Sequence, residues 1–199
     1  MANNIITISR EFGSGGREIG KKLAEQLGVE CYDSRLIQMA SEFGKVDLER
    51  ISYLEEQKAN PLLYTVHNEL QNEKTGYGIP ANDIIFNLQS AVIKQLAKRE
   101  PCIIVGRCAD YVLKDFPNVY SVFVFSDMEN RVKRIIERYD KFDDKNARAL
   151  IKREDKKRKA YYNYYTNKQW DDKDSYDICI NSGKLGIERC VKLLASLNK

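Results

Sequence analysis

The sequence predicts an α/β fold with a mostly parallel sheet that carries helices on both faces. Short runs of β-branched and other apolar residues alternate along the chain with segments whose apolar residues recur at helical spacing. A glycine-rich segment, Gly13, Gly15 and Gly16, joins the first predicted strand to the first predicted helix. The chain has 199 residues, of which 43% are hydrophobic and 31% are charged, and these values are typical of one compact globular domain.

The first part of the chain contains two strands and two helices. Residues 5–8 form a short β-branched run, and residues 17–27 place apolar side chains on one helical face. Residues 29–32 are consistent with a second strand. The pair 33–34, Asp-Ser, has the composition of a helix N-cap, and it precedes a helix over 36–43 that ends at a glycine.

The remaining elements follow from the same criteria. We expect helical segments at 46–57 and from 61 onward, a loop at 73–80, a helix at 82–98, a strand at 102–105, a helical turn at 110–114, a strand at 119–125, helices at 127–139 and 143–167, a strand at 176–180 and a last helix at 185–197. The helix at 143–167 is very polar. Because residues 140–167 include few apolar side chains to anchor them, we expect this segment to be the most mobile ordered part of the protein.

The glycine loop predicts a phosphate-binding site. Glycines allow the backbone N–H groups to turn towards a ligand, and the following helix adds the positive end of its dipole. The predicted phosphate-binding residues are Gly13, Ser14, Gly15, Gly16 and Arg17. The alternative is a tight turn that only leads into a helix.

The loop departs from the common pattern G-x-x-x-x-G-K-[ST]. With Gly16 as the second glycine, Glu11 stands at the first glycine, Arg17 at the lysine and Glu18 at the hydroxyl residue. Arginine keeps the positive charge and can bind phosphate oxygens through its planar fork. Glu18 is explained if it faces outward in the first helical turn, where acidic residues are favoured; Ser14 or Ser9 would then supply a hydroxyl.

Several polar segments directly follow predicted strands. In parallel sheets, ligands bind at the carboxyl ends of the strands. The segments 9–17, 33–35, 106–110 and 126–127 should therefore converge on one edge of the sheet. Arg107 follows a strand and a glycine, so it either binds a phosphate or forms an internal ion pair.

Charge is distributed unevenly along the chain. The net charge is +4, but residues 131–159 hold thirteen Lys and Arg against six Asp and Glu. This basic segment indicates either a dedicated anion site or a solvated charged helix. Arg153 and Arg158 lie in it, and a hinged segment could bring them onto a transferring phosphate.

The five cysteines and the hydropathy indicate a cytoplasmic protein. Their number is odd and none forms a C-x-x-C pair, so we expect free thiols in a reducing compartment. No apolar run is long enough to span a membrane, and residues 1–9 lack the layout of a signal peptide.

Four segments resemble one known family. They are SREFGSGGREIGKKLAEQLG, YDSRLI, VGRCADYVL and INSGKLG, and they look like the cytidylate-kinase-like family of P-loop proteins, which is related to the nucleoside monophosphate kinases. The resemblance implies a three-layer P-loop kinase core with a five-stranded parallel sheet in the order 2-3-1-4-5. It implies a single domain, 1–199, with its core at 1–41, 82–139 and 168–199, a helical monophosphate-binding insert at about 42–82 and a lid at about 140–167.

The resemblance also implies an activity, which is transfer of the ATP γ-phosphate to a nucleoside monophosphate with magnesium. The implied catalytic residues are Arg17, Arg107, Arg153 and Arg158. The implied acceptor-binding residues are Asp33, Arg35, Arg107 and Asp110. Ser14 would contact magnesium, mainly through the phosphates. We expect nucleotides as partners, neither a membrane nor nucleic acid, and we leave the oligomeric state open.

The chain departs from cytidylate kinases at three positions. They have the standard lysine and hydroxyl where this chain has Arg17 and Glu18, and an acidic residue that reads cytosine where this chain has Cys108. Nucleotide binding survives these changes better than specificity for CMP does, so the acceptor could be another nucleotide or small molecule. Two other hypotheses remain, a non-catalytic nucleotide-binding or regulatory protein and nucleic-acid binding through the basic segment.

Overall fold

The computed structural model describes residues 4–46, 49, 81–139 and 142–198, and these residues form one five-stranded sheet. The strands are β1 (Ile5–Arg10), β2 (Glu30–Tyr32), β3 (Cys102–Val105), β4 (Val119–Phe125) and β5 (Ile178–Asn181). Their order is β2-β3-β1-β4-β5, and every neighbouring pair is parallel. The predicted α/β class and strand order are therefore confirmed.

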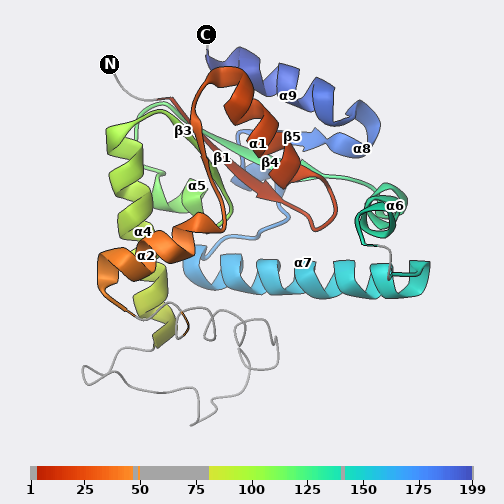
Figure 1. Ribbon diagram of the computed structural model, residues 1–199, viewed down its shortest axis with the longest axis horizontal. Coiled ribbons are helices and arrows are strands. Elements are labelled where there is room, and N and C mark those ends of the chain that lie inside the picture. Colours follow the sequence, from red (N-terminus) through yellow and green to blue (C-terminus); the bar gives the residue numbers. More distant parts are fainter. Residues whose placement is uncertain (1–3, 47–48, 50–80, 140–141, 199) are drawn as a thin grey trace.

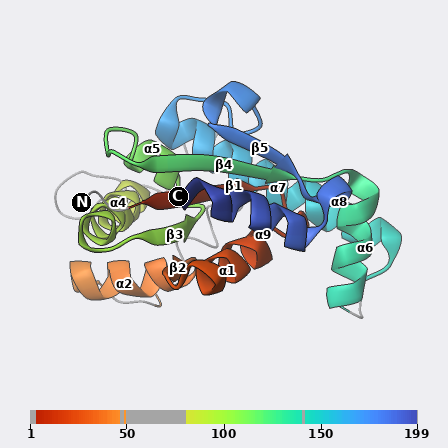
Figure 2. The same cartoon turned by 90° about the horizontal axis from the view of Figure 1, so that it is seen from above.

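Helices cover both faces of this sheet (Figures 1 and 2). One face carries α1 (Gly16–Leu27) and α9 (Ile187–Ala195); the other carries α4 (Ala81–Arg99), α5 (Ala109–Val112) and α7 (Asp144–Thr166). Helix α2 (Arg35–Gly44) packs on α4, while α6 (Met128–Arg138) follows β4 and α8 (Ser182–Leu185) follows β5. Short 3-10 turns at Lys173–Ser175 and Ser196–Asn198 complete the described elements.

Alternating side chains along the strands divide the core into layers. Because successive residues of a strand face opposite sides, Ile5 packs with Ile104 towards α2 and α4. Ile6 and Ile8 point the other way and pack with Val105 towards α1 and α9. The central strands are buried on both faces, which explains their nearly continuous apolar sequence.

Helix α7 has few buried apolar residues, as predicted, and they lie near its two ends. Ala147 and Ile151 are fully buried against Val132 of α6. Near the other end, Tyr162 is 3% exposed and packs in a cluster with Phe123 of β4. The few apolar residues of α7 are therefore concentrated where the helix contacts α6 and β4, and the expected mobility of this segment stays a prediction.

Some local predictions also need correction. Ser34 precedes α2, but its side chain makes no capping hydrogen bond. Gly186, with φ 76°, separates α8 from α9, so the helix predicted at 185–197 begins at Ile187, and the short helix α8 was not predicted. Apart from residues 46 and 49, the segments predicted at 46–57, from 61 onward and at 73–80 lie outside the described residues. No helix among the described residues is both long enough and apolar enough to cross a membrane.

Candidate active site

The glycine loop connects β1 to α1 and leaves the start of that helix uncapped. Gly13 and Gly15 have φ values of 81° and 82°, a left-handed conformation that glycine adopts without a steric penalty. No side chain caps α1, and its first hydrogen bond runs from the amide of Ile19 to the carbonyl of Gly15 at 2.9 Å. The preceding N–H groups of α1 have no acceptor within the helix, so they can bind an anion.

The structure shifts the loop by one residue relative to the predicted register. Gly15 precedes α1, and Gly16 is the first helical residue. In the common pattern the lysine opens the helix, so Gly15 is the second glycine and Gly16 stands at the lysine. Arg17 then stands at the hydroxyl residue and Arg10 at the first glycine. The prediction was wrong here because two adjacent glycines do not reveal from sequence which one opens the helix.

The side chain of Arg10 lies between Gly16 and Gly106. A Cβ on Gly16 would lie 2.5 Å from Arg10 Cβ, and a Cβ on Gly106 would overlap Arg10 Nη1. The side chain is partly buried. Burial, and then the positive charge of Arg158, lower the pKa of Arg10 to about 9. Sequence reasoning missed this residue because the predicted register placed Glu11, not Arg10, at the first glycine of the pattern.

Four arginines converge where β1 and β3 end. The positive charges of Arg17, Arg107 and Arg158 disfavour the protonated form of Arg10. The negative charge of Asp33 favours that form. Arg158 also donates from Nη1 to the carbonyl oxygen of Arg10 at 2.9 Å. Such a concentration of positive charge beside uncapped amides is suited to a polyphosphate or to two phosphate groups.

Asp33 holds one of these arginines in place. Arg17 Nε forms an ion pair with Asp33, which directly follows β2. Arg17 Nη2 also lies 3.4 Å from Ser34 Oγ, within hydrogen-bonding distance. The side chain of Arg17 is 52% exposed, so part of its guanidinium remains accessible to a ligand.

Arg107 lies in a turn after β3 whose backbone is in the left-handed conformation. Gly106, Arg107 and Cys108 have φ values of 79°, 61° and 53°, which makes three successive left-handed residues. The amide of Gly106 donates to the carbonyl of Ile8 at 3.0 Å, so this turn is fixed to β1. Left-handed non-glycine residues are costly and concentrate at functional sites. The turn thus orients Arg107 at the edge where the arginines meet.

Glu11 has a structural role that explains its presence in the loop. Its Oε2 accepts a hydrogen bond from the amide of Ser126 at 3.0 Å and pairs with Arg131 Nη1 at 3.0 Å. Arg131 is 4% exposed, donates from Nε to the carbonyl of Phe12 at 2.9 Å, and also pairs with Asp155 of α7. Burial raises the pKa of Glu11, while its bonds to Ser126 and Arg131 lower it.

The predicted lid helix therefore contacts the loop directly. Asp155 accepts a hydrogen bond from the amide of Phe12 at 2.7 Å, and the guanidinium of Arg158 lies 5.3 Å from the centre of the Phe12 ring. Together with Arg131, these contacts connect α6 and α7 to the loop. Helix α7 therefore lies against the loop in this structure.

The other predicted residues have different partners. Arg153 is 62% exposed and pairs with Glu154, and Arg35 lies 3.5 Å from Glu30. Asp110 accepts a hydrogen bond from the hydroxyl of Tyr162 at 2.6 Å, and burial raises its pKa. The structure thus brings together Arg17, Arg107, Arg158 and Asp33, while Arg153, Arg35 and Asp110 make contacts of their own.

The site suits magnesium only through bound phosphates. Ser14 is buried, and its hydroxyl donates to the carbonyl of Glu11 at 2.9 Å. Arg17 stands where the common pattern has a hydroxyl. Within the described part of the chain, no three His, Cys, Asp or Glu residues lie close enough to hold a metal. Magnesium is commonly bound by substrate phosphates with few protein ligands, and this arrangement is compatible with the loop.

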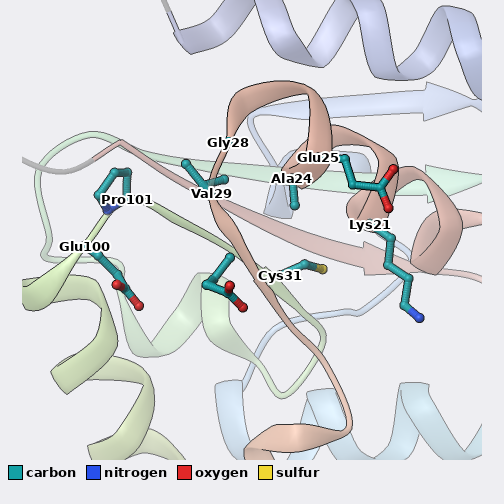
Figure 3. Close-up of a pocket in the computed structure, with 9 residues that line it drawn as sticks. Lys21, Ala24, Glu25, Gly28, Val29, Cys31, Glu100 and Pro101 are labelled. Atoms are coloured by element: carbon teal, nitrogen blue, oxygen red, sulfur yellow. The ribbon is translucent and has the colours of Figure 1, made fainter.

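A cavity of about 550 Å³ lies at the opposite end of the sheet (Figure 3). It is found where β2 and β3 begin, and it includes none of the arginines described above. Its charged lining consists of Lys21 with Glu25, Glu30 and Glu100. Three carboxylates against one ammonium make this cavity unsuitable for phosphate, so the arginine edge remains the candidate site.

A parallel sheet in this order, with a glycine loop leading from β1 into a helix, is the architecture of P-loop kinases. A shikimate kinase from Bacteroides thetaiotaomicron has the same fold, with a TM-score of 0.54, 17% identity and 98% of both chains covered. The chain belongs to the cytidylate kinase-like family, whose model matches residues 5–184.

Relatives match over nearly the whole chain. A cytidylate kinase from Methanosarcina barkeri is 30% identical over 180 residues, which cover 90% of this chain and 87% of the relative. One from Archaeoglobus fulgidus is 27% identical, with 95% and 91% covered. The crystal structure of an uncharacterized protein from Eubacterium ventriosum has a TM-score of 0.70 and 31% identity, with 98% of this chain and 97% of that chain covered.

Proposed function

We propose that the protein transfers the γ-phosphoryl group of ATP to a nucleoside monophosphate of the CMP or dCMP type. The observation that carries this proposal is the convergence of arginines beside the uncapped amides of α1. Family membership and the relatives named cytidylate kinase support the same reaction.

In the proposed reaction, an oxygen of the acceptor phosphate attacks the γ-phosphorus. The bond to the β–γ bridging oxygen breaks, and ADP leaves. The loop from Gly13 to Arg17 holds the phosphates of ATP. When bound, magnesium would neutralise charge on these phosphates, and Ser14 is the hydroxyl residue of the loop nearest to that role.

The acceptor side is assigned to residues that follow β2 and β3. Arg107 binds the acceptor phosphate, and Arg35, Asp33 and Asp110 contribute to acceptor binding. The insert at about 42–82, most of which lies outside the described residues, is assigned to binding the monophosphate. Arg153 and Arg158 belong to the lid at about 140–167, and they stabilise the negative charge that is transferred. The bond from Arg158 to the carbonyl of Arg10 supports its part in this assignment.

The test is an acceptor screen with the purified protein. ATP and magnesium are supplied with CMP, dCMP, UMP, AMP or GMP, and both ADP and the new nucleoside diphosphate are quantified. We expect CDP or dCDP to form in equal amount with ADP. An Arg107→Met variant should raise the KM for the acceptor, and an Arg189→Met variant, on the exposed side of α9, serves as the control.

Two outcomes would contradict the proposal. Release of ADP at the same rate with and without every acceptor would indicate an ATPase. Tight ATP binding without turnover of any acceptor would favour a non-catalytic nucleotide-binding or regulatory protein, in keeping with the loop's lack of a lysine.

A further inference from the structure

We infer that Arg10, in place of the lysine that opens the helix in the common pattern, supplies a cation that binds the β- and γ-phosphates of the donor nucleotide. This inference rests on the proposed function and adds a residue to the donor site. In the common pattern, a glycine ends the strand and a lysine opens the helix. Here these two residue types are exchanged, because Arg10 ends β1 and Gly16 opens α1.

Steric contact links the two positions. A Cβ built on Gly16 would lie 2.5 Å from Arg10 Cβ and 3.0 Å from Arg10 Cγ. Both distances are too short for a side chain at position 16 while Arg10 keeps its path. The chain can therefore place one long cation at this point, either at position 10 or at position 16, and it uses position 10.

The side chain of Arg10 extends from the start of α1 towards the turn that follows β3. Its side chain passes Gly16 and reaches Gly106, where its Cζ lies 3.2 Å from the position of a Cβ. Gly106 immediately precedes Arg107, which is the residue assigned to the acceptor phosphate. The guanidinium of Arg10 thus lies between the amides that receive the donor phosphates and the arginine that receives the acceptor. A planar fork at this place can bind two phosphate oxygens at once.

The charges around Arg10 favour an anion. The positive charges of Arg158, Arg107 and Arg17 disfavour the protonated form of Arg10. The carboxylate of Asp33 favours that form, but it is already paired with Arg17. This excess of positive charge accounts for part of the lowered pKa of Arg10, together with burial. A bound polyphosphate would supply the missing negative charge.

The experiment restores the residue types of the common pattern, a glycine at position 10 and a lysine at position 16. Four variants are compared with the parent: Arg10→Met, Arg10→Gly, Gly16→Lys, and the double variant Arg10→Gly with Gly16→Lys. Arg189→Met is the matched control, since Arg189 is exposed on α9. Binding of ATP and of inorganic tripolyphosphate is measured by calorimetry, phosphoryl transfer by the acceptor assay, and folding by the melting temperature.

We expect Arg10→Met and Arg10→Gly to weaken tripolyphosphate and ATP binding at least about tenfold, since a charge-assisted bond is lost. Gly16→Lys alone should lower the melting temperature because of the contact with Arg10. The double variant should bind both ligands more tightly than Arg10→Gly and recover part of the turnover, which a merely structural arginine would not allow.

Two results would overturn the inference. The first is parental binding of tripolyphosphate by a folded Arg10→Met variant. The second is a folded double variant that binds no better than Arg10→Gly. If Arg10→Gly does not fold, Arg10→Lys is compared with Arg10→Met instead, and an Arg10→Lys variant that binds tripolyphosphate no better than Arg10→Met would overturn the inference. A parent that binds ATP but phosphorylates no acceptor would contradict the proposed function, while the binding data would still decide the role of Arg10.

Discussion

Arg131 shows how one buried residue holds the site together. It bonds to the carboxylates of Glu11 and Asp155 and to the carbonyl of Phe12, and it is 4% exposed. In the sequence it is one of many basic residues in a polar segment. In the structure it connects α6 and α7, which are consecutive helices, to the loop between β1 and α1, which lies much earlier in the chain.

Replacing Arg131 should be far more harmful than replacing an exposed arginine. Arg131→Met would leave two partly buried carboxylates without their partner, and breaking such a pair costs about 3–5 kcal/mol. Arg148→Met is the matched control because Arg148 also bridges two carboxylates, Asp144 and Glu129, but at the surface. We expect a large fall in melting temperature for the first variant and little change for the second. Equal effects would contradict the central role of Arg131.

Arg17 should also matter for turnover, although it does not stand at the lysine position. Arg17→Met removes a charge that Asp33 holds beside the other arginines, and a lost charge-assisted bond costs about 1.5–3 kcal/mol. We therefore expect turnover to slow at least about tenfold, whereas Arg17→Lys should keep some ATP affinity. Turnover of Arg17→Met at the parental rate would make Arg17 a surface residue.

Asp110 should make stability depend on pH. Burial raises its folded pKa, so the folded state binds its proton more tightly than the unfolded state does. The free energy of unfolding should then fall as pH rises from the ordinary aspartate pKa through the raised folded value. Asp110→Asn keeps an acceptor for Tyr162 and removes this dependence. Urea unfolding across this pH range should show that the free energy of unfolding of the variant rises relative to that of the parent as pH rises. If the two free energies change in parallel with pH, the assignment to Asp110 is contradicted.

At the scale of elements, α7 lies against the loop between β1 and α1. Its two ends are buried against α6 and β4. Its middle bonds to the loop through Asp155 and to the end of β1 through Arg158. Four buried side chains hold a helix whose remaining surface is mostly polar or charged.

Breaking the central bond should loosen the loop without releasing the ends of α7. Asp155→Asn replaces the carboxylate that accepts from the amide of Phe12 and pairs with Arg131. Hydrogen exchange should become faster in residues 11–15 and in the middle of α7. Glu154→Gln, whose partners are Arg153 and Lys157, is the control. If Asp155→Asn exchanges like the parent, the apolar ends of α7 are sufficient to hold the loop.

At the scale of the whole molecule, the parallel sheet separates two ends of different charge. The carboxyl ends of β1 and β3 carry the arginines, while the cavity at the amino ends of β2 and β3 is lined by three glutamates. The net charge of +4 gives no hint of this division. Anionic substrates should therefore approach one end of the sheet only.

Crystals grown in sulfate or phosphate should show this preference directly. We expect an anion over the amides of residues 14–17, where α1 begins without a cap. The cavity lined by Glu25, Glu30 and Glu100 should contain no anion. Ordered anions elsewhere, but none at the loop, would count against phosphate binding by these amides.

The sequence by itself determined the architecture. Hydrophobic periodicity is a local property, so the strands, most helices and the parallel class could be predicted from neighbouring residues. The rule that parallel strands carry ligands at their carboxyl ends correctly placed Arg17, Asp33 and Arg107 near one another. The glycines located the turn between β1 and α1, with the start of the helix misplaced by one residue.

Only the tertiary structure decided which side chains share a space. The path of Arg10 is set by Gly16 and by Gly106, which follows a different strand, β3. The role of Glu11 depends on Arg131, and the firm seat of α7 depends on burial against α6 and β4. These properties arise from contacts between distant segments, whose packing and charge no local pattern encodes.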